Sequence, residues 1–283
     1  MSLYVTSLNT GSNGNCFYIG NEQEAILVDA GISCREIGKR MNRLGLSMEK
    51  IKAIFVSHEH SDHIRGIHSL VKKYHLPVYI TPPTAQNGRL YLDNGYIRSF
   101  KPHEPVSIGH LTITAFPKFH DASDPYSFTI GCRDVKVGVF TDIGIPCQHV
   151  VNYFQQCHAV FLEANYDDDM LENGDYPFHL KKRIRSNYGH LSNHQALDLF
   201  KRYRPSFMSH LFLSHLSKNN NCPNLVKELF DRHAEGVTMV VASRYAETDV
   251  YHIQSSATSP LIKNEKPGLS LTTSQAQLEF SFA

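Results

Sequence analysis

Short runs of apolar residues, several of them alternating with polar ones, dominate the first half of the chain, and this pattern predicts β-strands. Strands are expected at residues 3–8, 16–19, 25–28, 51–56, 78–81, 97–100, 105–108, 111–117, 126–131 and 135–140. Helical spacing favours helices over 33–44, over 64–74 and just after 82–83. In the second half, strands near 159–163, 207–213 and 237–242 alternate with helices. Strands followed by helices, twice over, predict two sheets with helices on their outer faces, a layered α/β architecture.

The character of the sequence changes near residue 255. From there on Ser, Thr, Lys, Pro and Gln prevail, with few large apolar residues before Leu278, Phe280 and Phe282. We therefore predict one domain over 1–254 and a Ser/Thr-rich tail over 255–283, flexible or docked on a surface.

Composition and charge narrow the class of protein. The 283 residues are 41% hydrophobic and 19% charged, which is ordinary globular composition. A net charge of +1 excludes a globally basic nucleic-acid binder, so any DNA or RNA contact must use a local patch. The six cysteines contain no C-x-x-C pair, and neither the first eight residues nor any later run suggests a leader or a membrane span. We expect a cytoplasmic protein with reduced thiols and no membrane contact.

The segment Ser57-His58-Glu59-His60-Ser61-Asp62-His63 follows a strand predicted to be buried and precedes a predicted helix. Its H-x-H-x-D-H spacing therefore places three imidazoles and a carboxylate on one turn at a strand end. Imidazole and carboxylate suit zinc, manganese or iron, and the sequence does not separate these metals. We predict a metal site formed by His58, His60, Asp62 and His63.

This spacing after a buried strand resembles the signature of the metallo-β-lactamase superfamily. The resemblance implies an αββα four-layer sandwich and two divalent metal ions. It also implies that the first two histidines bind one metal and that the Asp-His pair binds the other.

The resemblance implies three further ligands at strand ends, which we identify as His120, Asp142 and His215. His110 is a rival for His120, and His210 is a rival for His215. The first metal would then take His58, His60 and His120, and the second Asp62, His63 and His215. Asp142 would bridge the two metals.

Two cations about 3.5–4 Å apart lower the pKa of a shared water and clamp an ester or phosphate oxygen. Asp62 would orient that water, so we also assign it a catalytic role. The predicted reaction class is metal-assisted hydrolysis.

Further segments resemble one branch of the superfamily, that of YycJ and WalJ. They are Gly11-Ser12-x-Gly14-Asn15, Glu163-Ala164-Asn165-Tyr166-Asp167, Tyr176-Pro177-x-x-Leu180-Lys181-x-Arg183-Ile184, Gly189-His190-Leu191-Ser192-Asn193 and His215-Leu216-Ser217-Lys218-x-Asn220-Asn221. This resemblance covers about residues 2–245 and implies a 5′-to-3′ exonuclease on double-stranded DNA, linked to DNA repair. Many members have His where this chain has Tyr166, which leaves any ligand or proton-transfer role at that position open.

Substrate contacts are expected from a basic cluster of Lys181, Lys182, Arg183 and Arg185, of which we select Lys181 and Arg183. The alternative is a solvated helix face. Ser192 and Gln195 form a capping box, which places residues 189–193 at a helix N-terminus that favours an anion, and Asn193 is assigned to the substrate on this ground. His190 would bind the scissile phosphate or protonate the leaving oxygen, and a structural role for it remains open.

Rival functions remain at this stage. A small-molecule phosphodiesterase or a glyoxalase II-like thioesterase would use the same metal ligands, and a metal-stabilised binding module would have no turnover. Between Asp142 and His215 lie 72 residues, too few for the additional domain that β-CASP nucleases insert there. The oligomeric state is not predicted.

Overall fold

The computed structural model describes residues 2–255, so the predicted tail lies outside the described residues. Two seven-stranded sheets form the centre of the domain. In spatial order the first contains β14 (Tyr251–Ile253), β1 (Leu3–Asn9), β2 (Cys16–Gly20), β3 (Ala25–Val28), β4 (Ile51–Phe55), β5 (Val78–Tyr79) and β6 (Ile97–Arg98). The second contains β13 (Thr238–Val241), β12 (His210–Ser214), β11 (Ala159–Glu163), β10 (Val135–Phe140), β9 (Tyr126–Cys132), β8 (Leu111–Pro117) and β7 (Pro105–Ile108).

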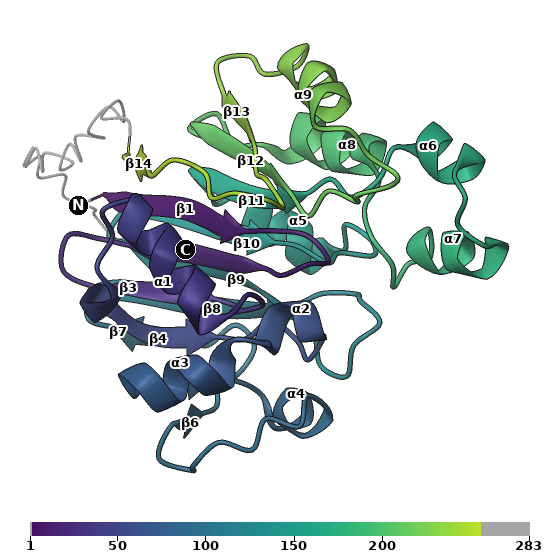
Figure 1. Cartoon of the computed structure of the whole chain (residues 1–283). Coiled ribbons are helices and arrows are strands. Elements are labelled where there is room, and N and C mark those ends of the chain that lie inside the picture. The colour runs from purple at the N-terminus through teal and green to yellow at the C-terminus, as the bar shows by residue number, and fades with distance from the viewer. Residues whose placement is uncertain (1, 256–283) are drawn as a thin grey trace, which may run out of the picture.

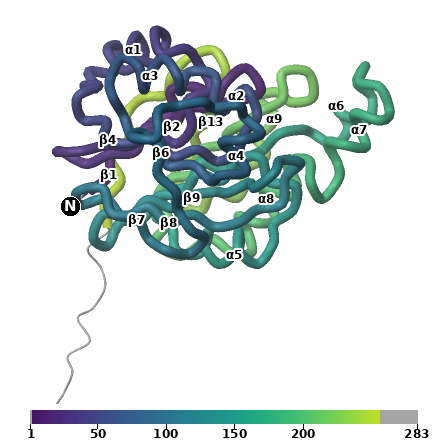
Figure 2. The backbone as a smooth tube through the Cα atoms, turned by 90° about the horizontal axis from the view of Figure 1, so that it is seen from below, coloured from purple at the N-terminus to yellow at the C-terminus, as the bar shows by residue number. Residues whose placement is uncertain are grey.

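Helices cover the outer face of each sheet. On the first sheet lie α1 (Cys34–Arg43) and α3 (Ile67–Tyr74), and on the second lie α5 (Gln148–Phe154), α8 (Asn193–Tyr203) and α9 (Pro223–Asp231). Figure 2 shows α1 and α3 on one side of the sheets and α5 and α8 on the other. The predicted αββα four-layer sandwich is therefore confirmed. Shorter elements are the 3₁₀ turn η1 (Met48–Lys50), α2 (Ser61–Ile64), α4 (Pro82–Asn87), α6 (Asp168–Asn173) and α7 (Phe178–Ile184).

The main core lies between the two sheets, where alternate side chains of their strands meet. Phe17 of the first sheet packs on Phe161 of the second, and Phe55 packs edge-on against Phe128, with ring centroids 5.0 and 5.7 Å apart. Separate apolar clusters lie beneath the helices on each outer face. Both faces of each sheet are thus buried, which explains why strands such as Ala25–Val28 are apolar at every position.

Parallel pairing brings the functional strand ends together. The pairs β3–β4 and β4–β5 are parallel in the first sheet, and β10–β11 and β11–β12 are parallel in the second. The carboxyl ends of parallel neighbours meet at one edge of a sheet, which is where α/β proteins place their ligands. The segments that follow β4, β10 and β12 carry predicted metal ligands.

Two elements differ from expectation. Strand β14 was not predicted; it pairs antiparallel with β1, Leu3 opposite Ile253. The helix expected over 64–74 is divided into α2 and α3 at Gly66, whose N–H donates to the carbonyl of Ala30 at 2.7 Å. A Cβ at Gly66 would lie 2.1 Å from the carbonyl oxygen of Ile32, so the break is a close backbone contact that periodicity does not reveal.

The six cysteines are free thiols, and four of them are buried. Burial raises the pKa of Cys157 to about 12, so this thiol is unreactive at neutral pH. Within residues 2–255, no helix has both the length and the apolar character needed to cross a membrane.

Candidate metal centre

The histidine-rich turn after β4 is held by backbone hydrogen bonds from two neighbouring loops. The N–H of Asn15 donates to the carbonyl of Asp62 at 2.7 Å, and the N–H of Ala30 donates to that of His63 at 2.8 Å. Gly31 lies against the same turn, where a Cβ would be 1.6 Å from the carbonyl oxygen of Asp62. The turn is therefore positioned by the protein before any ligand binds.

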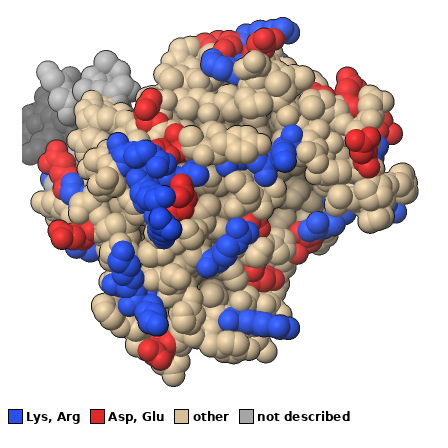
Figure 3. Space-filling model, viewed as in Figure 1, with Lys and Arg blue, Asp and Glu red and all other residues tan. Residues whose placement is uncertain are grey.

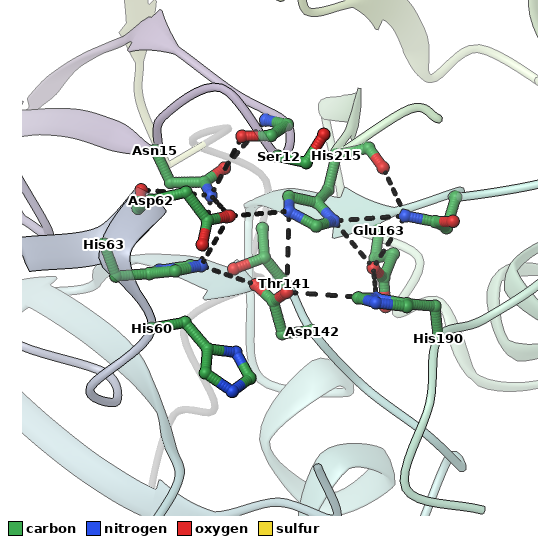
Figure 4. A network of polar contacts seen from close by, with 12 residues as sticks. Ser12, Asn15, His60, Asp62, His63, Thr141, Asp142, Glu163, His190 and His215 are labelled. Carbon is green, nitrogen blue, oxygen red and sulfur yellow. Dashed lines mark hydrogen bonds and ion pairs between the residues drawn. The ribbon is translucent and has the colours of Figure 1, made fainter. Parts of the chain in front are cut away.

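All seven predicted ligands come together at the edge of the sandwich. Figure 4 shows five of them: His60, Asp62, His63, Asp142 and His215. One set contains His58, His60 and His120, and another contains Asp62, His63 and His215; within each set the candidate ligand atoms lie within 4.8 Å of one another. Nε2 of His58 lies 3.1 Å from Nδ1 of His60, which is in turn 3.3 Å from Nε2 of His120.

Asp142 lies between the two sets. Its Oδ2 is 3.3 Å from Nε2 of His63, and its Oδ1 is 3.5 Å from Nε2 of His215 and 3.8 Å from Nε2 of His120. A carboxylate with two oxygens facing histidines of both sets has the geometry that a bridging ligand requires.

Three residues of the site adopt left-handed backbone conformations directly after a strand. The φ angles are 59° at Asp29, 54° at Asp142 and 57° at His215. Such angles are uncommon for residues other than glycine and concentrate at functional sites. Each one turns the chain sharply at the end of β3, β10 or β12, next to the metal ligands.

Sequence reasoning assigned no role to two buried carboxylates that support the histidines. Asp29 lies 2.7 Å from Nδ1 of His63, and Glu163 lies 2.7 Å from Nδ1 of His190 and 3.0 Å from Nδ1 of His215. Carboxylates in this position orient metal-binding imidazoles and fix their tautomer. A signal was present for both, because Asp29 directly follows the apolar strand β3 and Glu163 is the acidic last residue of the otherwise apolar strand β11.

Asn15 is a third supporting residue. Its side-chain amide donates to Oδ2 of Asp62 at 3.2 Å and lies 3.0 Å from Nε2 of His63. It thereby connects the glycine-containing loop after β1 to the second ligand set.

Burial keeps two imidazoles of the first set neutral. It lowers the pKa of His58 well below the usual range, and it lowers the pKa of His120 to about 3. A neutral imidazole is the form that binds a metal, so these residues need no deprotonation.

The second set is charged in the metal-free protein. Burial would lower the pKa of His63, but the carboxylates of Asp142 and Asp29 outweigh it and raise the value to about 10. Burial would also lower the pKa of His215, but the carboxylate of Asp142 outweighs this effect and raises the pKa of His215 well above its usual range. Burial would raise the pKa of Asp142, yet the neighbouring His215 and His63 hold it well below normal.

Two buried polar atoms of the site have no hydrogen-bond partner: Oδ2 of Asp142 and Nε2 of His215. Unsatisfied buried groups are rare in folded proteins and call for an explanation. A divalent cation would satisfy both atoms, and the imidazole and carboxylate donors are those that zinc, manganese and iron accept. The residues present therefore fit a metal.

The rival histidines lie elsewhere. His110 is exposed and pairs with Glu24, and His210 contacts Ser209 while its ring stacks on Phe212. His190 is close to the ligand sets, with its ring centroid 5.2 Å from that of His120 and 5.4 Å from that of His215. It also belongs to a group with Asp142, Glu163 and His215 that has metal-ligand spacing.

Of the other predicted substrate residues, Arg183 comes near a metal ligand, because it pairs with Asp121, whose Oδ1 lies 3.4 Å from Nε2 of His120. Lys181 and Arg183 lie on α7, which stands out from the sandwich with α6 in Figures 1 and 2. The side-chain N–H of Asn193 donates to Oδ1 of buried Asn221, and Oδ1 of Asn193 accepts from the Asn221 amide. This pairing is structural, and contact of Asn193 with the substrate stays a prediction. Tyr166 is buried, which raises its pKa to about 12, so its phenol stays protonated at neutral pH.

Three of the cations in and just after α7 have partners. Arg183 pairs with Asp121, Arg185 pairs with Glu172, and the Lys181 ammonium donates to the carbonyl of Glu172. Figure 3 shows Lys and Arg in several separate groups on the face in view, with Asp and Glu among them. A single basic patch is not visible on this face.

An αββα sandwich with linked sets of imidazole and carboxylate ligands at its edge defines a metallo-hydrolase. The family model described as "Beta-lactamase superfamily domain" matches residues 24–215. Exodeoxyribonuclease YycJ of Bacillus anthracis is 32% identical over 232 residues, which are 80% of this chain and 87% of that protein. Exodeoxyribonuclease WalJ of Streptococcus pneumoniae serotype 2 (strain D39 / NCTC 7466) is 33% identical over 227 residues, which are 78% of this chain and 83% of that protein.

Among solved structures, the metallo-beta-lactamase fold protein YhfI from Bacillus subtilis matches with a TM-score of 0.69. At 18% identity, over 89% of this chain and 100% of that one, this match shows the fold alone. The chain belongs to the metallo-β-lactamase superfamily, and the resemblance to its YycJ/WalJ branch is confirmed. The protein is thus a metal-dependent hydrolase.

Proposed function

We propose that this protein is a dinuclear exodeoxyribonuclease that degrades double-stranded DNA in the 5′-to-3′ direction. The observation that carries the proposal is Asp142, whose carboxylate faces histidines of both ligand sets. Relatives that cover most of the chain and are named exodeoxyribonucleases support DNA as the substrate. The cytoplasm and DNA repair remain the predicted setting.

In this proposal His58, His60 and His120 hold one cation, and Asp62, His63 and His215 hold the other, with Asp142 between them. When bound, two divalent cations would supply a water of lowered pKa and neutralise charge on the phosphate. Zinc and manganese are the proposed metals, and iron fits the same donors.

Asp62 and His190 carry the remaining chemistry. Asp62 is partly exposed and is held by Asn15, so its carboxylate accepts a hydrogen bond from the attacking water and orients it. Glu163 fixes Nδ1 of His190, which leaves Nε2 to donate a proton to the leaving oxygen. His190 is partly exposed, as a group that contacts substrate must be.

Lys181 and Arg183 remain proposed contacts to the DNA backbone. A phosphate that binds them has to compete with the carboxylate of Asp121 and with the Glu172 carbonyl. We therefore expect their contribution to affinity to be modest.

The test is cleavage of end-labelled linear duplex DNA by protein loaded with Mn²⁺ or Zn²⁺. Label loss that proceeds from the 5′ end, is absent on closed circular DNA and is absent in His60→Ala would support the proposal. The matched control is His68→Ala, because His68 is an exposed histidine on α3 outside the ligand sets. This variant should cleave like the wild type.

A different result would redirect the assignment. Well-metallated protein that leaves DNA intact but hydrolyses bis(p-nitrophenyl) phosphate would be a small-molecule phosphodiesterase. Hydrolysis of a thioester alone would point to glyoxalase II-like chemistry, and metal binding without any turnover would point to a binding module.

A further inference from the structure

A cavity of about 300 Å³ lies beside the metal centre. Its lining includes Thr10, Ser217, Lys218, Ser243, Arg244 and Tyr245, at the ends of β1, β12 and β13. This volume is at the lower end of the range of small-ligand sites, about 300–1,000 Å³. A sugar-phosphate unit is of suitable size for it.

The cavity shares a wall with the metal centre. Thr10 Oγ1 accepts a hydrogen bond from the N–H of His215 at 3.0 Å and donates to the side-chain oxygen of Asn15 at 3.1 Å. Asn15 in turn holds Asp62. A strand bound in the cavity therefore lies next to the residues proposed to cleave it.

The charge of the cavity is positive. Lys218 and Arg244 line it, no Asp or Glu is among the lining residues, and neither cation forms an ion pair within residues 2–255. The guanidinium of Arg244 contacts neutral groups: it donates to the carbonyl of Leu216 at 3.5 Å and to Oγ of Ser12 at 3.3 Å, and it lies 5.9 Å from the centre of the Tyr245 ring. Ser12 appears beside the metal ligands in Figure 4.

The N-terminal end of helix α9 adds to the positive charge of the cavity. The helix begins at Pro223, which lines the cavity; the side chain of the N-cap residue Cys222 makes no cap hydrogen bond, and the N–H of Cys222 donates to Oδ1 of Asn221 at 2.8 Å. The N-terminal end of a nine-residue helix carries partial positive charge and favours an anion. Two cations without an ion pair in residues 2–255 and the start of α9 thus meet at one cavity, whereas Arg183 and Arg185 already face carboxylates.

From this arrangement we infer that the cavity lined by Lys218 and Arg244 binds a backbone phosphate of the nucleic-acid strand next to the scissile bond. The inference rests on the proposed nuclease function and names the main contact to its substrate. Tyr245, which is 70% exposed on the rim, offers a face on which the adjoining base stacks.

The experiment compares wild type with Lys218→Gln, Arg244→Gln and the double variant. Binding is measured by fluorescence anisotropy on duplex DNA whose terminal linkages are phosphorothioates, over a series of salt concentrations. The double variant should bind about 10- to 100-fold more weakly, and the slope of log K against log salt should fall by one to two, since each phosphate contact contributes about 0.9. Hydrolysis of bis(p-nitrophenyl) phosphate is measured in parallel, and a loss as large as the loss of DNA affinity would overturn the inference, because it would place the damage at the metal centre rather than in the cavity.

Arg35→Gln/Lys39→Gln is the matched control, because it removes one exposed Arg and one exposed Lys from α1. It should leave the affinity within about twofold. Arg244→Lys keeps the charge and should retain most of the salt slope. If Arg244→Gln does not fold, as judged by thermal melting, Lys218→Gln alone decides the matter, since Lys218 is exposed.

Unchanged affinity and salt slope in Lys218→Gln and in the double variant would overturn the inference even if the protein degrades DNA. Binding that depends on Lys218 in a protein that never cleaves DNA would instead refute the nuclease proposal and leave the phosphate site standing. The two failures are therefore distinguishable.

Discussion

The carboxylate of Asp29 lies 2.7 Å from Nδ1 of His63, and both side chains are fully buried. This contact leaves Nε2 of His63 directed at Asp142, 3.3 Å away. Asp29 also accepts hydrogen bonds from the N–H and the hydroxyl of Ser57, each at 2.8 Å. One carboxylate thus fixes the start of the histidine-rich turn and the orientation of its last ligand.

Asp29→Asn should weaken metal binding by the set of Asp62, His63 and His215 about 10- to 100-fold, which is typical for loss of a residue that orients a metal-binding histidine. Asparagine tolerates the left-handed backbone of this position, so the fold should persist. Metal titration followed by elemental analysis would reveal the loss. Asp134→Asn, at an exposed position, is the control, and equal metal affinity in both variants would contradict the assigned role.

Glu163→Gln should lower kcat about 100-fold or more, because the proposed proton donor His190 loses the carboxylate that orients it. The Glu163→Gln/His190→Ala double variant should be no slower than the slower single variant, since the two residues act as a unit. Losses that multiply would show that the residues act independently. Since Glu163 also contacts His215, metal content must be measured alongside kcat.

Metal binding should release about two protons at pH 7. The pKa of His63 is raised to about 10 and that of His215 lies well above its usual range, so both imidazoles are protonated in the metal-free protein at pH 7 and must lose that proton to bind. Apparent metal affinity should therefore rise with pH, and proton release should diminish as the pH passes about 10. Calorimetric titration in buffers of different ionisation enthalpy measures this release, and enthalpies that do not depend on the buffer would disprove it.

Gly31→Ala should destabilise the protein by about 2–4 kcal/mol and displace the histidine-rich turn, because the new Cβ would meet backbone that has no room to move. Gly38→Ala on α1 is a matched control. Nothing lies within 4 Å of a Cβ there, and alanine favours a helix by about 0.5–1 kcal/mol over glycine. Chemical denaturation should thus move the two variants in opposite directions, and similar stabilities would refute the close contact at Gly31.

Much of the fold could be predicted from local pattern. Strands such as Ala25–Val28 and Val135–Phe140 have the predicted bounds, because strands buried on both faces are mostly apolar between polar turns, with Lys136 the one charged residue of these two. Strand β14 was missed, since its three residues form a strand through pairing with β1. Where a distant contact sets the end of a helix, as at Gly66, the neighbouring sequence contains no pattern that predicts it.

The sequence by itself determined the metal chemistry of this protein, because H-x-H-x-D-H concentrates its donors within six residues of one turn. The supporting carboxylates were decided by tertiary structure alone. Asp29 is 34 residues from His63 and Glu163 is 52 residues from His215, and they reach these histidines because parallel pairing aligns the ends of neighbouring strands. The phosphate cavity arises in the same way: Lys218 stands in a motif of the branch and Arg244 in none, and the lack of a carboxylate partner that they share within residues 2–255 becomes visible when β12, β13 and the loop after β1 meet.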